Sequence, residues 1–170
     1  MDFLEKDLEE IIYTADRKEL EERGLEINGK LLRQVRIGNY GIADLISVER
    51  VLDFSYYERT KKYKCNLFIT VYELKRDKIG LSAFLQATRY ARGIQRYLQK
   101  RNFAFNVCFK LVLIGSKVEE SDLVYLGDIN TSSTGEYFEE LGLTFYTYNY
   151  SLSGLEFTNK STYMLSEEGF

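Results

Sequence analysis

Three side chains that could perform metal-dependent chemistry lie in two strand-like segments of the sequence. Asp44 ends the run Gly-Ile-Ala-Asp, and Glu73 and Lys75 lie two residues apart in the run Val-Tyr-Glu-Leu-Lys. Residues two apart on a strand point to the same side, so Glu73 and Lys75 project together. If the two strands are antiparallel neighbours, Asp44 comes alongside Glu73. Two close carboxylates repel each other unless a cation lies between them, which predicts a divalent metal site beside a lysine.

The composition narrows that chemistry further. The 170 residues include no histidine, which excludes Ser-His and Cys-His catalysis and zinc sites with imidazole ligands. Carboxylates, lysine and tyrosine remain, and hard oxygen ligands favour Mg²⁺ or Mn²⁺. The two cysteines, Cys65 and Cys108, are too few and too far apart for a disulfide scaffold, and we interpret both as buried free thiols.

The sequence is typical of one soluble globular domain spanning residues 1–170. No apolar run approaches the roughly 20 residues that cross a bilayer, so we expect no membrane contact. The first ten residues, MDFLEKDLEE, are charged from the second position and have no signal-peptide core. Together with the two free cysteines, these features predict a cytoplasmic protein.

Charge is unevenly distributed along the chain, although the whole carries −3. Residues 1–29 hold 4 Lys/Arg and 10 Asp/Glu, residues 30–115 hold 17 and 6, and residues 116–170 hold 2 and 10. The resulting net charges are −6, +11 and −8. A basic centre between acidic ends indicates a surface that faces a polyanion such as DNA. Cations scattered over a solvated surface would give the same counts, so this alternative stays open.

The elements that must position these side chains follow from hydrophobic spacing. Apolar residues three and four apart predict helices, and alternating or continuous apolar runs predict strands. A helix between strands implies a crossover and therefore a mixed sheet. The expected order is a helix at 2–13, a short helix at 17–23, strands at 31–37 and 42–52, a hairpin tip at 53–64, a strand at 65–74, a long helix at 81–100, strands at 107–114 and 123–126, a short helix at 135–141, and strands at 143–150 and 155–158.

These features resemble the PD-(D/E)XK nuclease superfamily, particularly its RecB-type branch. That pattern is a G-x-x-D strand turn, an acid-x-lysine strand and a helix bearing Q-x-x-x-Y. The chain supplies the three parts in that order: Gly41 to Asp44, Glu73 to Lys75, and Gln86 to Tyr90. An isolated E-x-K occurs by chance on many surface strands, whereas the three parts together are more specific. The resemblance covers about residues 2–115, with a strand-rich extension over residues 116–170. It implies an α/β fold: a restriction-endonuclease-like core with a mixed central sheet flanked by helices.

The same resemblance implies a role for each residue. Asp44, Glu73 and the backbone carbonyl of Leu74 would hold Mg²⁺ (or Mn²⁺). Lys75 would orient or activate the attacking water. Gln86 would help to position Lys75 or the substrate. The alternative readings are a turn carboxylate at Asp44 and a cross-strand ion pair between Glu73 and Lys75.

The family's leading acid lies on the first helix, where three glutamates compete for the role. Glu5 and Glu9 flank the apolar stripe that centres near Leu8, whereas Glu10 points away. Glu5 lies nearer the stripe and fits the family's acid-x-x-leucine spacing with Leu8. We therefore predict Glu5 as the fourth metal-site residue, acting through water.

Residues that would contact DNA follow the acid-x-lysine strand directly. Several would line the long helix beside the metal and contact phosphates. The predicted set is Arg76, Lys78, Arg89, Tyr90, Arg96 and Lys100. The hairpin tip combines three lysines and three tyrosines and could clamp a nucleic-acid strand, although an ordinary solvated hairpin is an equal alternative.

The sequence therefore predicts a Mg²⁺-dependent nuclease that hydrolyses DNA phosphodiester bonds. The alternative is a catalytically inactive nuclease-fold module that binds nucleic acid or serves as an assembly subunit. A homodimer or a larger DNA-processing complex is compatible with either function. A third reading, a structural protein that oligomerises through its tyrosine-rich tail, draws support only from residues 144–150.

Overall fold

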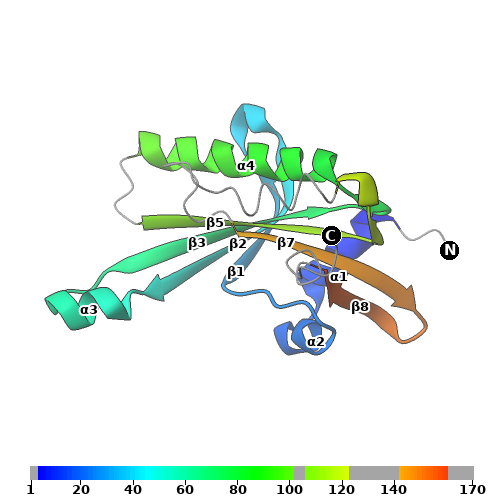
Figure 1. The fold of residues 1–170 in the computed structure, drawn as a ribbon, viewed down its shortest axis with the longest axis horizontal. Coiled ribbons are helices and arrows are strands. Elements are labelled where there is room, and N and C mark those ends of the chain that lie inside the picture. Colours follow the sequence, from blue (N-terminus) through cyan, green and yellow to red (C-terminus); the bar gives the residue numbers. More distant parts are fainter. Residues whose placement is uncertain (1–3, 102–105, 123–141, 161–170) are drawn as a thin grey trace.

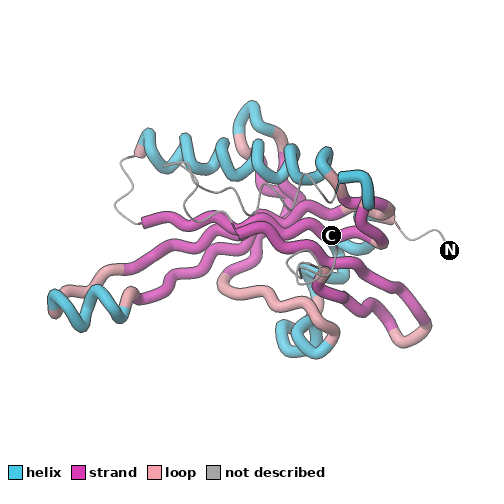
Figure 2. Tube along the Cα trace, viewed as in Figure 1, coloured by secondary structure: helices cyan, strands magenta, loops and turns pink. Residues whose placement is uncertain are grey.

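The computed structural model describes residues 4–101, 106–122 and 142–160, and Figure 2 shows how these divide into helices, strands and loops. Nearly all of the apolar runs become strands of one sheet, and the longest amphipathic run becomes one helix. The elements in chain order are α1 (Glu5–Thr14), α2 (Arg17–Glu22), β1 (Lys30–Arg36), the 3-10 turn η1 (Gly38–Tyr40), β2 (Ile42–Leu52), α3 (Phe54–Thr60), β3 (Cys65–Leu74), β4 (Lys78–Ile79), α4 (Leu81–Lys100), β5 (Asn106–Gly115), β6 (Lys117–Val118), β7 (Gly142–Ser151) and β8 (Gly154–Asn159).

Six strands form a mixed sheet in the order β1-β2-β3-β5-β7-β8. The pairs β1–β2, β2–β3 and β7–β8 are antiparallel, whereas β3–β5 and β5–β7 are parallel. Helix α4 connects β3 to its parallel neighbour β5, as a crossover requires. The predicted α/β class with a mixed central sheet is therefore confirmed. A small second sheet pairs β4 with β6.

Helices cover both faces of the large sheet (Figure 1). On one face α4 packs through Ala83, Phe84 and Ala87 against the inward side chains of the central strands. On the opposite face α1 packs through Leu8 and Ile12, and Leu20 of α2 joins the same cluster. A central strand covered on two sides must be apolar on both, which explains the continuous run of buried residues along β3.

The predicted hairpin tip at 53–64 contains a helix, α3, rather than only a turn. Asp53 initiates it, because its Oδ1 accepts a hydrogen bond from the backbone N–H of Tyr56 at 2.9 Å. Lys61 ends the helix with a left-handed φ of 59°. The helix has no hydrophobic face packed on the core, so its spacing gave no amphipathic pattern in the sequence.

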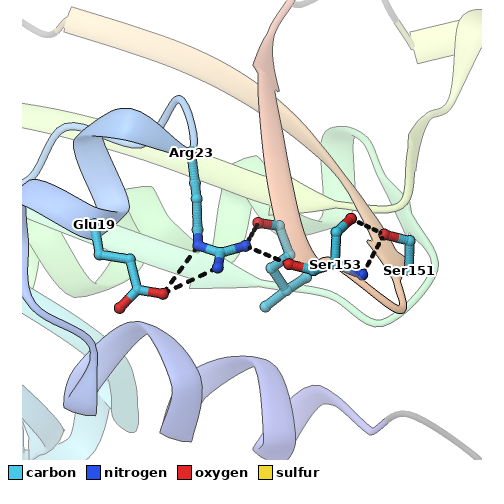
Figure 3. Close-up of polar contacts among 5 residues, drawn as sticks. Glu19, Arg23, Ser151 and Ser153 are labelled. Atoms are coloured by element: carbon cyan, nitrogen blue, oxygen red, sulfur yellow. Dashed lines mark hydrogen bonds and ion pairs between the residues drawn. The ribbon is translucent and has the colours of Figure 1, made fainter.

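The last two strands join the same sheet and contact the N-terminal helices. Arg23, which follows α2, pairs with Glu19 and donates Nη1 to the carbonyl oxygens of Ser153 at 3.0 Å and Leu155 at 3.1 Å (Figure 3). The Phe157 amide donates to the Arg23 carbonyl at 2.7 Å. The predicted strands at 143–150 and 155–158 correspond to β7 and β8. The predicted elements at 123–126 and 135–141 lie outside the described residues. Among the described helices, none is long and apolar enough to cross a membrane.

Candidate functional site

Strand register brings the two predicted carboxylates to the same end of the sheet. Strands β2 and β3 are antiparallel and pair Leu45 with Tyr72 and Ile46 with Val71, so continuing the register places Asp44 opposite Glu73. Asp44 Oδ2 also accepts a hydrogen bond from the Leu74 amide at 3.1 Å, which ties it to β3. The predicted proximity of Asp44 to β3 is therefore confirmed.

Glu73 is the most unusual polar residue of the sheet. Its side chain is 0% exposed, and Oε1 accepts a hydrogen bond from Lys75 Nζ at 2.7 Å. Its other oxygen, Oε2, is buried and has no hydrogen-bond partner among the described residues. A buried carboxylate oxygen without a partner loses its hydration without compensation. Glu73 Oε2 can therefore accept one further hydrogen bond or bind a cation.

Burial makes both carboxylates harder to ionise. It raises the pKa of Asp44 to about 6, an effect that the Leu74 amide partly opposes and the Glu5 carboxylate increases. It also raises the pKa of Glu73 to about 7, despite the Lys75 ammonium, and the neighbouring Asp44 contributes to the rise. For Lys75, burial is the largest single effect and lowers the pKa, but the hydrogen bond to Glu73 and the negative charges of Glu73, Glu5 and Asp44 together outweigh it, so the pKa is raised. One lysine therefore does not supply enough positive charge for both acids.

The first helix brings further acids to this end of the sheet. The Glu5 carboxylate acts on the pKa of Asp44, Glu73 and Lys75, which supports its assignment as the fourth residue of the cluster. Glu9, one turn later, also acts on Asp44 and is 5% exposed. Glu9 accepts hydrogen bonds from Arg33 Nε and Gln34 Nε2 of β1.

From the sequence, Glu9 is considered only as an alternative to Glu5, and its contacts with β1 are not predicted. Its spacing of four from Glu5 indicates the shared helix face, but the partners on β1 could not be found without the packing of α1 on the sheet. Gln34 holds a left-handed φ of 49°, a conformation that non-glycine residues rarely adopt. The Glu9 cluster fixes α1 against β1 and so positions Glu5.

Gln86 and Tyr90 of α4 pair with each other instead of with the carboxylates. Gln86 Nε2 donates to the Tyr90 hydroxyl at 2.9 Å and, among the residues described, makes no hydrogen bond to Lys75, so of its two predicted roles only the contact with substrate stays a prediction. Tyr90 is 2% exposed, which corrects its prediction as a DNA-binding residue, because a side chain in the core cannot contact a phosphate. Its ring lies against Gly41, where a Cβ atom would come within 3.1 Å of Tyr90 Cε1. Gly41 has φ of 114°, so the Gly of G-x-x-D permits both the turn and this contact.

A second close approach holds α4 on that turn. A Cβ atom at Gly93 would lie 2.6 Å from Ile37 Cγ2 and 2.7 Å from Tyr40 Cγ. Arg96 Nη1 donates to the Tyr40 hydroxyl at 2.6 Å, and the Arg96 guanidinium carbon lies 5.9 Å from the Tyr40 ring centre. Contacts with α4 therefore hold in place the turn that precedes Asp44.

The predicted basic residues differ in their surroundings. Arg76, Arg89, Arg96 and Lys100 are exposed. The Arg89 guanidinium carbon lies 5.5 Å from the Tyr90 ring centre and Nη2 lies 3.5 Å from the place of a Cβ atom at Gly41. Arg89 and Arg96 thus flank the turn before Asp44. Lys78 pairs with Glu119 of the loop after β6, so its charge is already compensated.

The donor set suits a hard divalent cation with few protein ligands. Two carboxylates and a backbone carbonyl of β3 are oxygen ligands of the kind that Mg²⁺ prefers, and Mg²⁺ usually keeps several waters. Within the described residues, no group of three or more His, Cys, Asp or Glu side chains is arranged to hold a metal ion unaided. The orphaned Glu73 Oε2 and the raised pKa values of both acids fit a site for one cation that also relies on water and the substrate.

Comparison with known proteins adds no relative. No family model, no curated protein and no solved structure matches the chain. The residues of the site, and the α/β architecture that positions them, are therefore the basis for assigning a function.

Proposed function

We propose that this chain is a Mg²⁺- or Mn²⁺-dependent nuclease that hydrolyses DNA, with a restriction-endonuclease-like core as the PD-(D/E)XK resemblance implies. The observation that carries the proposal is the buried Glu73 carboxylate. It lies opposite Asp44, with one oxygen bonded to Lys75 and the other without a partner. Burying Glu73, with the half-buried Asp44 opposite it and one lysine beside it, has a free-energy cost that a purely structural role would not require.

In the proposed reaction Asp44, Glu73 and the carbonyl of Leu74 would hold the metal, and Glu5 would support it through water. The bound cation supplies Lewis-acid chemistry by offsetting negative charge that develops on the phosphate. Lys75, held by Glu73 at 2.7 Å, orients the attacking water by hydrogen bonding. Its raised pKa keeps the amine protonated, so Lys75 acts as a hydrogen-bond donor to that water.

Exposed cations on α4 provide the DNA contacts of this proposal. Arg89 and Arg96 flank the turn that leads to Asp44, and Lys100 lies one further turn along the same helix face. They belong to the segment 30–115 with its net charge of +11. Phosphates held by these side chains would place the backbone of a DNA strand beside the carboxylates. Tyr90 and Lys78 have no part in this surface, because one is buried and the other is paired.

The test is a cleavage assay over a panel of duplex, single-stranded, flapped and branched DNA, in Mg²⁺, in Mn²⁺ and in chelator. We expect cleavage only with metal, and its loss in Asp44→Asn and Glu73→Gln. The matched control is Glu156→Gln, which neutralises an exposed acid on β8 far along the sheet order from β2.

Two outcomes would reject the proposal. If Glu73→Gln cleaves DNA at the wild-type rate, the proposed metal-dependent mechanism is ruled out. Equal DNA binding in chelator and in Mg²⁺, with no cleavage of any substrate, would favour the non-catalytic binding module instead.

A further inference from the structure

The β2–β3 hairpin extends beyond β1 and carries α3 at its end. Strand β1 pairs with β2 only as far as Val48, whereas β2 continues to Leu52. Figure 1 shows α3 projecting from the sheet, apart from the helices that cover its faces. We call residues 53–64 the tip. The catalytic proposal does not use these residues.

The tip exposes aromatic rings that a folded domain ordinarily buries. Phe54 is 69% exposed and Tyr63 is 75% exposed. Tyr63 also stacks on Tyr57, with ring centres 4.7 Å apart and planes inclined by 22°. Leu52, at the end of β2, adds an apolar side chain that is 42% exposed. Clustered exposed aromatics mark interaction sites more often than single exposed ones do.

Cations surround these rings. Lys61 Nζ lies 5.7 Å from the centre of the Tyr57 ring, and Lys64 Nζ lies 5.4 Å from that of Tyr56. Arg59, Lys61, Lys62 and Lys64 face only two acids in the tip, Asp53 and Glu58. The Asp53 carboxylate is engaged at the start of α3. Over the described parts of the chain, no ion pair neutralises any of the four cations.

We propose that the tip binds single-stranded nucleic acid, by stacking unpaired bases on Phe54 and Tyr63 while Lys61 and Lys62 contact the phosphates. Sequence-independent single-strand binding combines aromatic faces that stack on bases with positive charges that contact the backbone, and the tip exposes both. A duplex does not offer its base faces for stacking. An acidic peptide would use the cations but not the rings, and a second copy of the tip would bring like charges together.

The distance between the tip and Asp44 predicts which DNA substrates could contact both. This prediction, unlike single-strand binding by the tip itself, rests on the proposed nuclease function. Eight residues of β2 separate Asp44 from Leu52, about 27 Å at the rise of an antiparallel strand. A stacked strand advances about 3.4 Å per nucleotide, so the tip would meet DNA about eight nucleotides from the carboxylates. Substrates with a single-stranded segment at that distance from a duplex are therefore the class that reaches both sites.

The experiment measures binding of a fluorescent single-stranded oligonucleotide by anisotropy, in chelator, so that no cleavage is needed. Phe54→Ala with Tyr63→Ala should weaken binding at least about tenfold. Lys61→Gln with Lys62→Gln should reduce the log–log salt slope by about 1.4, at about 0.7 per phosphate contact on a single strand. The matched controls, Leu152→Ala for an exposed apolar residue and Lys6→Gln with Lys18→Gln for two exposed lysines, should bind like wild type.

Because binding is read in chelator, a chain that never cleaves DNA still tests the tip, and the two proposals fail separately. Unchanged single-strand affinity in both tip variants, with each variant folded by circular dichroism, would overturn the proposal. So would a concentration-dependent dimer that disappears in Phe54→Ala with Tyr63→Ala, since the tip would then bind a second copy. If the tip and the metal site act on one substrate, the tip variants should lose cleavage of flapped DNA but retain cleavage of short duplexes.

Discussion

Replacing Glu73 by glutamine should stabilise the metal-free protein at alkaline pH and flatten its pH dependence. The folded-state pKa of Glu73 is raised from the ordinary 4.5 to about 7, chiefly by burial. Ionisation is therefore harder in the folded state than in the unfolded chain. The contribution of this group is fully present below pH 4.5 and is lost as pH rises through about 7. Glutamine resembles the protonated acid in shape and has no charge to lose.

The magnitude follows from the two pKa values. A shift from 4.5 to about 7 corresponds to roughly 3 kcal/mol at 1.4 kcal/mol per pKa unit. Between pH 5 and pH 8, about 2 to 3 kcal/mol of this should be lost in the wild type and retained in Glu73→Gln. For a chain of this length that difference is roughly 5 to 10 °C in Tm.

The assay is thermal or urea denaturation in chelator at pH 5 and pH 8, for wild type, Glu73→Gln and Glu156→Gln. Comparing the change between the two pH values cancels any effect of the substitution that does not depend on pH. Glu156 is exposed, so its variant should follow the wild type. The same pH dependence in wild type and Glu73→Gln would refute the conclusion that Glu73 is a buried, under-compensated acid.

Three further outcomes follow from the same geometry. Lys75→Gln should lower the cleavage rate by roughly 10²- to 10⁴-fold while Mn²⁺ binding persists, because the amine is not a metal ligand; loss of both together would make Lys75 a structural residue. Neutralising three exposed cations on one face of α4, Arg89, Arg96 and Lys100, should lower the log–log salt slope of duplex DNA binding by roughly 0.9 per contact. An unchanged slope would mean that this helix face is only solvated. Gly93→Ala should destabilise the protein by about 1–2 kcal/mol in urea denaturation because its Cβ would meet Tyr40, whereas Gly142→Ala, with only an ordinary 3.5 Å contact, should not; equal stabilities would contradict the close packing of α4 on the turn.

Sequence alone predicted the elements whose burial pattern is strong. Strands β2 and β3 and helix α4 have the predicted bounds, because long apolar runs and a 20-residue amphipathic run leave few alternatives. Helix α3 was missed, since it packs no apolar face on the core, although Asp53 provides the side chain that typically starts a helix. The parallel pairing of β7 with β5 depends on contacts distant in sequence, which local patterns do not encode.

The positions of the site residues could be predicted from the sequence where strand alternation and strand pairing determine them. Glu73 and Lys75 share a face because they are two residues apart, and Asp44 follows from antiparallel pairing. Side-chain partners were not predictable in this way. Gln86 bonds to Tyr90 on its own helix, and Lys78 pairs with Glu119 across a loop, because both choices depend on how elements pack.

The most direct test of the central claim is a titration with Mn²⁺, followed by electron paramagnetic resonance of the free ion. If Asp44 and Glu73 form the metal site, wild type and Glu156→Gln should show saturable binding near pH 8 that is lost in Asp44→Asn and Glu73→Gln. Binding should weaken toward pH 5, because protons compete for carboxylates whose pKa values are about 6 and about 7. Equal Mn²⁺ binding by wild type and Glu73→Gln, or no saturable binding by the wild type, would contradict the account.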